Sequence, residues 1–130
     1  MRKLLIVEDE PILRETYQLI LSTQPYLCDV ASDGKEALEL CKVKNYDLIL
    51  LDLMMPIMDG VEFLENYNDL HGVKSKVIVL SNLSSGKEVV QALELGAAKN
   101  FVKSDLSPSQ LIALVRYELD ARIGSDLVAR

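Results

Sequence analysis

Residues 48–60 read LILLDLMMPIMDG and contain the clearest signal of fold in the chain. The first four residues form a continuous apolar run, which is typical of a strand buried on both faces of a sheet. The run stops at the acidic residue Asp52, after which Pro56 and the pair Asp59-Gly60 indicate an irregular loop. We therefore predict a buried strand whose carboxyl end presents an acidic side chain.

Four further runs on either side of this strand alternate with segments of helical periodicity. The runs cover residues 4–7, 26–31, 77–80 and 100–102. The helical segments cover about residues 11–23, 33–41, 61–68, 85–96 and 107–121. Apolar strands separated by helices are typical of a parallel sheet covered on both faces. We expect an α/β fold of the flavodoxin-like type, a three-layer (βα)5 domain with a central five-stranded parallel sheet in the order 2-1-3-4-5.

Three helix starts carry residue pairs that can form a capping box, in which side chains and backbone amides of the first turn bond reciprocally. These pairs are Asp33/Glu36, Ser85/Glu88 and Ser107/Gln110. Gly96 is well placed to end the fourth helix. The sequence beyond about Arg122 is polar, so we expect it to fray. One domain is thus predicted over residues 1–121, followed by a short C-terminal tail over residues 122–130.

The bulk composition excludes several classes of protein. Hydrophobic residues make up 49% of the chain, enough to fill a core, and the net charge of -6 argues against nonspecific binding of nucleic acid. No apolar run approaches the roughly 20 residues of a membrane span, and Leu4–Val7 is too short for the core of a signal peptide. We predict a cytoplasmic protein that binds neither nucleic acid nor membrane, with Cys28 and Cys41 as buried, reduced thiols.

In the predicted strand order, polar residues from four strands meet at one edge of the sheet, where ligands of such folds bind. They are Glu8, Asp9, Glu10, Asp52, Ser81 and Lys103. Two carboxylates about 4 Å apart repel by roughly 4 kcal/mol at an effective dielectric constant near 20. The acidic cluster therefore needs a cation, or some of its members must take up protons. Ligands that are all oxygen favour magnesium over zinc.

A carboxylate held beside magnesium is a plausible nucleophile toward phosphorus. Magnesium, Lys103 and the Ser81 hydroxyl with nearby backbone amides can neutralise the three phosphoryl oxygens, which is most of what phosphoryl transfer requires. Plainer interpretations exist for each residue alone: Glu8 and Asp9 can favour a helix dipole, Asp52 can cap a turn, and Lys103 can be a solvated surface charge. Their combination at one sheet edge favours the phosphoryl-transfer site.

These residues lie in stretches that resemble the response-regulator receiver domains. The resemblance spans about residues 3–121, and its motifs are LLIVEDE, LILLDLMMPIMDG, VLSN and NFVK. It implies a bacterial, CheY-like phosphoacceptor switch of a two-component phosphorelay, which takes a phosphoryl group from a histidine kinase or phosphotransfer protein. Such a domain is a signalling protein rather than an enzyme, although it assists its own phosphorylation and dephosphorylation.

The resemblance also implies the roles of the acidic residues. Asp52 is the expected phosphoacceptor and a magnesium ligand. Asp9 is expected to ligate magnesium directly, and Glu8 to assist, through a water molecule. The backbone carbonyl of Met54 is expected to complete the protein ligands.

The remaining roles concern the switch. The resemblance implies that Lys103 pairs with the phosphoryl oxygens, that Ser81 is the switch hydroxyl, and that Phe101 is the coupled aromatic. Pro56 and Gly60 are expected to shape the loop beside the site. The expected output surface is the face built from the fourth helix, the fifth strand and the fifth helix.

Three positions depart from the family pattern. Glu8 stands where an aspartate is frequent, and Asn82 follows the switch hydroxyl where a small residue is usual. Ser104 stands where the family usually has a proline after a cis bond. Because a cis bond to a residue other than proline costs about 3 kcal/mol, we predict a trans bond between Lys103 and Ser104.

Several alternatives remain open on the sequence. A flavin-binding flavodoxin-like protein would need a phosphate-binding loop after the first strand, whereas residues 8–11 would repel phosphate. A phosphatase of the haloacid-dehalogenase type would need its nucleophile after the first strand. A degenerate receiver that acts as a scaffold would not need the full set of site residues. The chain is either a stand-alone receiver or part of a longer regulator, a monomer or a phosphorylation-dependent homodimer, and its target is unknown.

Overall fold

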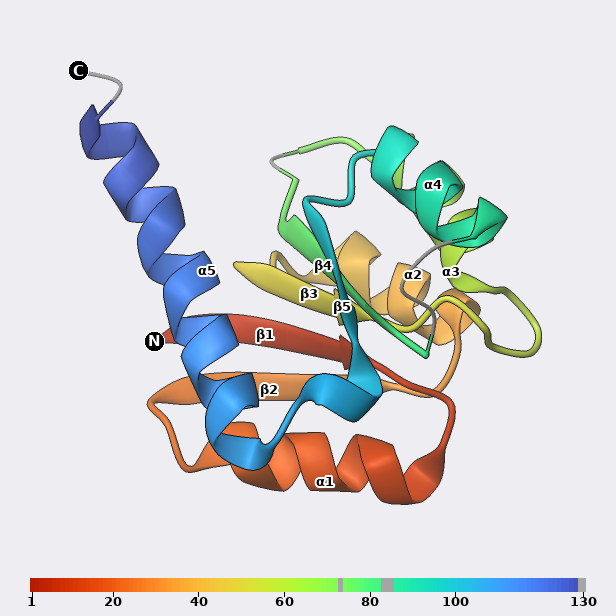
Figure 1. Ribbon diagram of the computed structural model, residues 1–130. Coiled ribbons are helices and arrows are strands. Elements are labelled where there is room, and N and C mark those ends of the chain that lie inside the picture. Colours follow the sequence, from red (N-terminus) through yellow and green to blue (C-terminus); the bar gives the residue numbers. More distant parts are fainter. Residues whose placement is uncertain (73, 83–85, 129–130) are drawn as a thin grey trace.

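The computed structural model describes residues 1–72, 74–82 and 86–128 (Figure 1). Strands and helices alternate along this part of the chain, as the apolar runs predict. The elements are β1 (Arg2–Val7), α1 (Pro11–Ser22), β2 (Tyr26–Ala31), α2 (Gly34–Val43), β3 (Leu48–Leu51), α3 (Gly60–Asn68), β4 (Lys76–Ser81), α4 (Lys87–Glu94), β5 (Lys99–Val102) and α5 (Pro108–Val128). A short 3-10 helix, Lys103–Asp105, joins β5 to α5.

The strands of the described chain are all parallel and form one sheet in the order β2-β1-β3-β4-β5, which confirms the predicted topology. In the register of this sheet, Val7 of β1 lies opposite Leu51 of β3, and Leu51 lies opposite Val79 of β4. The carboxyl ends of these strands therefore meet at one edge. Figure 1 shows the arrowheads of β1, β4 and β5 pointing toward it.

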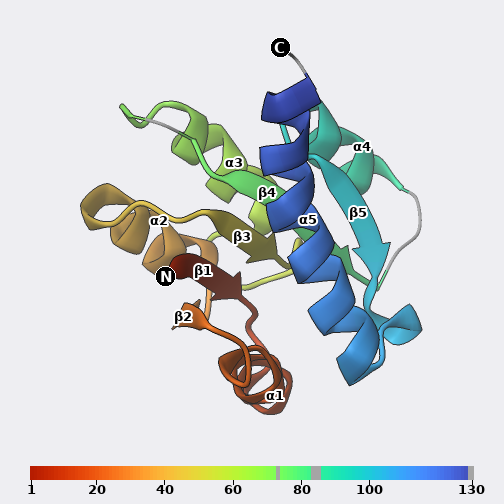
Figure 2. The same ribbon diagram turned by 90° about the vertical axis from the view of Figure 1, so that its left-hand side faces the viewer.

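Helices cover both faces of the sheet, which confirms the predicted three layers. Helices α1 and α5 lie on one face, and α2, α3 and α4 lie on the other (Figure 2). Successive side chains of a strand point to opposite faces. In β3, Leu48 and Leu50 pack into the cluster of α1 and α5, whereas Ile49 and Leu51 pack with Phe63 of α3. Burial on both faces explains why β3 is an unbroken apolar run.

The predicted helix caps have mixed outcomes. The capping box at α5 is complete, since Gln110 N donates to Ser107 Oγ at 3.2 Å and Ser107 N donates to Gln110 Oε1 at 2.7 Å. At α2, Asp33 accepts from Glu36 N at 2.9 Å, but the Glu36 carboxylate accepts from Ser32 instead of returning to Asp33. The predicted cap at Ser85 lies outside the described residues, and α4 begins at Lys87.

The end of α4 is the predicted one, because Gly96 has a φ of 109°, a conformation that glycine adopts without strain. The end of α5 differs from the predicted one. Helix α5 continues to Val128 and so includes most of residues 122–130, which we predicted to be a tail. No proline follows Pro108 to interrupt the helix. The domain boundary at residue 121 stays a prediction.

The cysteines differ from expectation in one respect. Cys28 and Cys41 are free thiols, as predicted, but both are half-buried, whereas we predicted buried thiols. Cys28 lies in β2, an edge strand with a neighbour on one side only. Burial raises the pKa of Cys41 to about 11, which keeps its thiol protonated and unreactive at neutral pH. In the described part of the chain, no helix combines the length and apolar character needed to cross a membrane.

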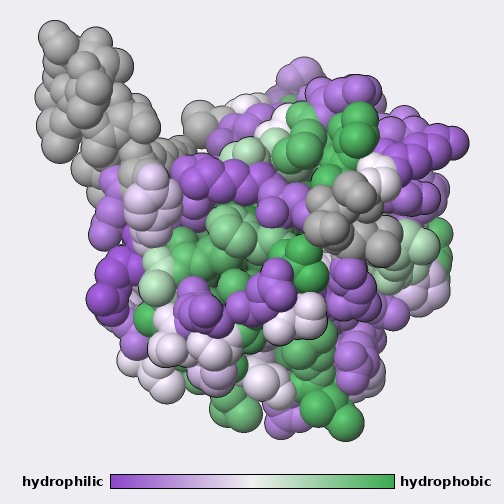
Figure 3. Space-filling view, in the orientation of Figure 1, coloured by the Kyte–Doolittle hydropathy of each residue, from purple (hydrophilic) through white to green (hydrophobic). Residues whose placement is uncertain are grey.

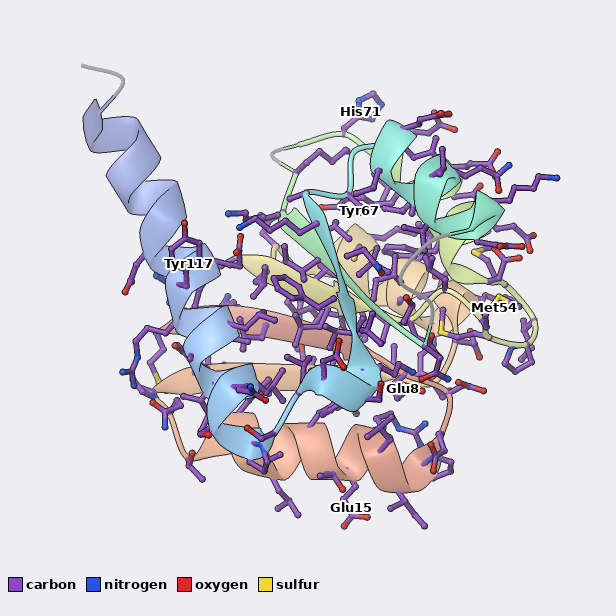
Figure 4. The ribbon with its side chains drawn as sticks, viewed as in Figure 1. Glu8, Glu15, Met54, Tyr67, His71 and Tyr117 are labelled. Carbon is purple, nitrogen blue, oxygen red and sulfur yellow. The ribbon has the colours of Figure 1, made fainter. Side chains whose placement is uncertain are left out.

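A cluster of charges around the buried Glu118 holds α5 against the sheet at the edge opposite the predicted site. Glu118 of α5 is only 1% exposed, and its two carboxylate oxygens lie 2.8 Å from Lys76 Nζ of β4 and 2.8 Å from Lys99 Nζ of β5. Lys99 also lies over the ring of Tyr117, 4.9 Å from its centroid, on the exposed side of α5 (Figure 4). These contacts anchor α5 to the amino ends of β4 and β5.

Gly60 lets α3 begin directly against the end of β3. A Cβ atom at this position would lie 2.6 Å from the carbonyl oxygen of Asp52 and 2.8 Å from Leu53 Cα. Gly60 N also donates to the carbonyl of Leu53 at 2.9 Å. The close approach needs a residue without a side chain, because backbone atoms cannot give way as a flexible side chain can. Gly60 therefore shapes the backbone at Asp52, as predicted.

Ile57 in the same loop has a strained backbone. Its φ is 70°, which is rare for a β-branched residue and costs about 1–2 kcal/mol. Its side chain is 76% exposed, so burial of apolar surface offsets little of this strain. Because asparagine tolerates this conformation, we expect Ile57→Asn to increase the free energy of unfolding by about 1 kcal/mol in urea titrations. The control is Ile12→Asn in α1, equally exposed at 75%, which should give no gain.

Candidate functional site

Three carboxylates converge at the carboxyl edge of the sheet. The parallel pairing of β1 continues past its last residue, since Glu8 N donates to Ala31 O and Asp52 N donates to Val7 O, both at 3.0 Å. As a result the carboxylate oxygens of Glu8, Asp9 and Asp52 lie within 4.8 Å of one another. The predicted convergence of acids from β1 and β3 is thus confirmed. Figure 4 shows Glu8 at this edge of the sheet.

Two of the three acids are deeply buried. Glu8 is 2% exposed and Asp52 is 7% exposed, while Asp9 is half-buried. Burial and the charge of Glu8 raise the pKa of Asp52 to about 7, although the ammonium group of Lys103 acts in the opposite direction. The pocket is therefore short of positive charge at neutral pH.

Lys103 faces the acids across the pocket, as predicted. Its Nζ lies 2.5 Å from Glu8 Oε1 and 3.2 Å from Asp52 Oδ2. Burial acts to lower the pKa of Lys103, but the hydrogen bond that Lys103 donates to Glu8 and the charge of Asp52 outweigh it and raise the pKa. Lys103 is accordingly a permanent cation that bridges the acids of β1 and β3.

Ser81 ends β4 beside this cluster and is 2% exposed. Its hydroxyl donates to Asn100 Oδ1 of β5 at 2.9 Å. Sequence reasoning identified Ser81 but missed this partner, because Asn100, the first residue of NFVK, was assigned no role. The bond links the ends of β4 and β5 next to the pocket.

The pocket has a volume of about 250 Å³, enough for a small ion and an oxyanion. Its walls are Glu8, Asp9, Glu10, Asp52, Leu53, Met54, Ser81, Asn82 and Lys103. All of the polar residues predicted at the strand ends therefore share one pocket. Met54 N donates to Asp52 Oδ1 at 3.4 Å, and the Met54 side chain is 62% exposed at the rim (Figure 4). Ligation by the Met54 carbonyl stays a prediction.

Phe101 lies apart from this pocket. It is half-buried, packs against the core of α1 and α5, and borders a groove of about 570 Å³ with Leu106, Leu114 and Tyr117. Figure 3 shows a hydrophobic hollow on this side of the molecule, between α5 and β5. Phe101 lies on β5 next to Asn100, which fits the predicted coupling to Ser81. The role of Phe101 in the switch stays a prediction. The bond between Lys103 and Ser104 is trans, as predicted.

The donor set fits a hard divalent cation. The three carboxylates offer oxygen ligands, and the pocket leaves room for water, which Mg²⁺ retains in proteins. No histidine or cysteine lines the pocket, so the ligands that zinc prefers are missing from this part of the described chain. Glu8, Asp9 and Asp52 are the residues that would hold the ion.

Arg14 is a residue of this region that sequence reasoning missed. It lies in the first turn of α1, and its Nη1 donates to the carbonyl oxygens of Glu8 at 2.9 Å and of Asp9 at 3.2 Å. The sequence signal was weak, since an arginine on a helix after an acidic stretch is ordinarily read as a surface charge. The contact makes Arg14 part of the support beneath the acidic residues.

Comparison with known proteins identifies relatives over most of the chain. Residues 4–116 match the family model of the response regulator receiver domain. The transcriptional regulatory protein DltR of Streptococcus agalactiae is 33% identical over 114 residues, which cover 88% of this chain and 50% of DltR. The nitrate/nitrite response regulator NarL of Escherichia coli is 33% identical over 111 residues, covering 84% and 50%. The chain thus spans about half the length of these relatives.

Solved structures resemble the whole fold. A CheY-like receiver domain protein from Methanospirillum hungatei superposes with a TM-score of 0.86 at 26% identity, covering 96% of this chain and 98% of its own. The signal receiver domain of a histidine kinase from Syntrophus aciditrophicus superposes with a TM-score of 0.81 at 30% identity, covering 93% and 92%. Sequence and fold therefore point to the same family.

Proposed function

Since the chain belongs to the response regulator receiver domain family of two-component signalling, we propose that it is a phosphoacceptor switch that takes a phosphoryl group on Asp52. The observation that carries the proposal is the convergence of Glu8, Asp9 and Asp52 around the ammonium group of Lys103. A flavodoxin-like flavin protein or a haloacid-dehalogenase-type phosphatase would belong to another family.

The residues of the pocket divide the work of phosphoryl transfer. A carboxylate oxygen of Asp52 attacks phosphorus as the bond between phosphorus and the donor's imidazole nitrogen breaks, and the electron pair of that bond stays on the nitrogen. Bound magnesium would supply positive charge against the acids and the phosphoryl oxygens. Lys103 is within reach of a phosphoryl group on Asp52, because its Nζ already lies 3.2 Å from Asp52 Oδ2. Met54 N–H helps to orient the Asp52 carboxylate.

We infer that the signal passes from β4 to β5. To reach a phosphoryl oxygen, the Ser81 hydroxyl must leave Asn100 Oδ1, with which it bonds at 2.9 Å. Loss of this bond changes the contacts of Asn100, the residue before Phe101, and Phe101 borders the groove between β5 and α5. The far end of α5 is anchored by Glu118, so we expect movement at the carboxyl ends of β4 and β5 and in α4. The face of α4, β5 and α5 is then the output surface.

The partners follow from the same proposal. A histidine kinase or phosphotransfer protein is the expected donor, and the receiving target is a protein of unknown identity. The relatives DltR and NarL are about twice as long as this chain, so the effector that the domain controls stays open. A monomer and a phosphorylation-dependent homodimer are both compatible with an output surface on α4, β5 and α5.

The decisive experiment is the intact mass of the protein after incubation with acetyl phosphate and magnesium. Wild type should gain the mass of one phosphoryl group, Asp52→Asn should gain none, and EDTA should abolish the gain. The control is Asp69→Asn after α3, which should be labelled like wild type. Labelling of Asp52→Asn to the same extent as wild type would refute the assignment of the phosphoacceptor.

The proposed route of the signal needs a separate measurement. Amide chemical shifts recorded with and without beryllofluoride, a phosphoryl mimic, should change at Asn100 and Phe101 and along α4 as well as around Asp52. Changes confined to the Asp52 pocket would contradict the output surface and leave the phosphoacceptor assignment intact.

A further inference from the structure

The peptide between Asp9 and Glu10 links the backbone of the acidic loop to the carboxylate of Glu8. Its N–H, which belongs to Glu10, donates to Glu8 Oε2 at 3.2 Å. Its carbonyl, which belongs to Asp9, accepts from Arg14 Nη1 at 3.2 Å. In a trans peptide the C=O and N–H groups point in opposite directions, so holding the carbonyl also sets the direction of the N–H. Arg14 therefore acts on Glu8 through this peptide.

Arg14 holds the preceding peptide as well. The same Nη1 lies 2.9 Å from the carbonyl oxygen of Glu8, so one nitrogen joins two successive carbonyls. The arginine itself is fixed by the first turn of α1, where its backbone N–H donates to Glu10 O at 2.9 Å. Lys103 takes the other oxygen of Glu8. Backbone and side chain of Glu8 are thus held from three directions.

We propose that Arg14 is a positioning residue that orients Glu8 and Asp9 for the divalent cation without touching it. The inference rests on the proposed function, since it assigns a role toward the metal of that same site. Outer partners that orient metal ligands commonly contribute 10-fold or more to metal affinity. The Arg14 side chain does not line the Asp52 pocket, so its action passes through the backbone.

Charge and positioning predict opposite results when Arg14 is replaced. If only its charge mattered, removing a cation near the site would tighten magnesium binding. If it positions the acidic residues, removal should weaken binding. Arg14→Lys keeps the charge and loses the planar fork, whereas Arg14→Gln keeps an N–H donor and loses the charge.

The test is the magnesium dissociation constant measured by titration calorimetry, together with amide hydrogen exchange at Glu10 in EDTA. We expect Arg14→Ala to raise the dissociation constant about 10-fold, with Arg14→Lys and Arg14→Gln in between. Exchange at the Glu10 amide should become about 10-fold faster in Arg14→Ala. The matched control is Arg116→Ala, which removes an exposed arginine bonded to Gln24 at 3.0 Å and should change neither quantity.

The outcomes separate the two proposals. Unchanged or tighter magnesium binding in Arg14→Ala, with wild type binding normally, would overturn the role of Arg14 alone. Failure of wild type to bind magnesium at millimolar concentrations would overturn the proposed function. Thermal melts in EDTA check that each variant is folded, and Arg14→Lys carries the test if Arg14→Ala is not.

Discussion

Without magnesium, Asp52→Asn is expected to be more stable than wild type by about 2–3 kcal/mol near pH 8, and to lose this advantage near pH 4. Burial and the charge of Glu8 raise the pKa of Asp52 to about 7 in the folded domain, from 3.8 for an ordinary aspartate. Above about pH 7 the folded domain must therefore hold a costly carboxylate. Asparagine has a similar shape and carries no charge.

The sign of the pH dependence follows from the raised pKa. Between about pH 4 and pH 7 the folded domain keeps a proton on Asp52 that the unfolded chain has lost, so stability falls as pH rises through this window. A shift of about three pKa units sets an upper limit of about 4 kcal/mol. Because Lys103 and Glu8 readjust when Asp52 ionises, we expect less than this limit.

Urea titrations in EDTA at several pH values measure the difference between the two proteins. Glu15→Gln is the control, because Glu15 points away from the domain on the solvent side of α1 (Figure 4) and its replacement should leave the free energy of unfolding unchanged. Magnesium should reverse the ranking, since an ion that binds the folded wild type stabilises it. Equal or lower stability of Asp52→Asn near pH 8 would show that the metal-free pocket tolerates the third charge.

The sequence was sufficient to predict the arrangement that makes this pocket. The alternation of apolar runs and helices predicts a parallel sheet, and five such units fit the flavodoxin-like strand order, in which the polar residues that end the runs fall at one edge. Asp9, Asp52 and Lys103 could be placed together for this reason alone, since the positions of strand ends depend on backbone periodicity and not on side-chain detail.

What the sequence could not predict depends on side-chain conformation. Lys103 bonds to Glu8 as well as to Asp52, and the Ser81 hydroxyl bonds to Asn100. Arg14 turns back onto two carbonyls, and nothing in the spacing of charges along α1 marks that choice. The positive φ of Ile57 was equally hidden, because a β-branched residue is the last that local preference would place there.

Lys103→Met should destabilise the metal-free domain by about 3 kcal/mol near pH 8, because it leaves two buried carboxylates without their counter-ion. Lys103 Nζ lies 2.5 Å from Glu8 Oε1 and 3.2 Å from Asp52 Oδ2, and its side chain is only 9% exposed. Methionine fills a similar volume, so the loss reports charge more than packing. The loss should shrink near pH 5, where Asp52 can take up a proton instead.

Two further variants isolate the charge effect. Lys44→Met removes an exposed lysine that lies 3.0 Å from Asp29, and should cost less than about 1 kcal/mol. Near pH 8, Asp52→Asn should stabilise the Lys103→Met background by more than it stabilises wild type, since it there removes a buried carboxylate that has lost its counter-ion. An equal gain from Asp52→Asn in the two backgrounds would mean that Lys103 stabilises the fold by packing, independently of Asp52.

Magnesium affinity should change in the opposite direction to stability in Lys103→Met. In the metal-free domain, Lys103 supplies part of the positive charge that balances the acids. It therefore competes with the ion for Glu8 and Asp52. Lys103→Met should therefore bind magnesium about 10-fold more tightly than wild type while being less stable in EDTA. It should also give less phosphorylated product from acetyl phosphate, because the phosphoryl oxygens lose a cation. Calorimetric titration and intact mass on one preparation test both expectations, and weaker magnesium binding in the variant would mean that Lys103 holds the acids in place more than it competes for them.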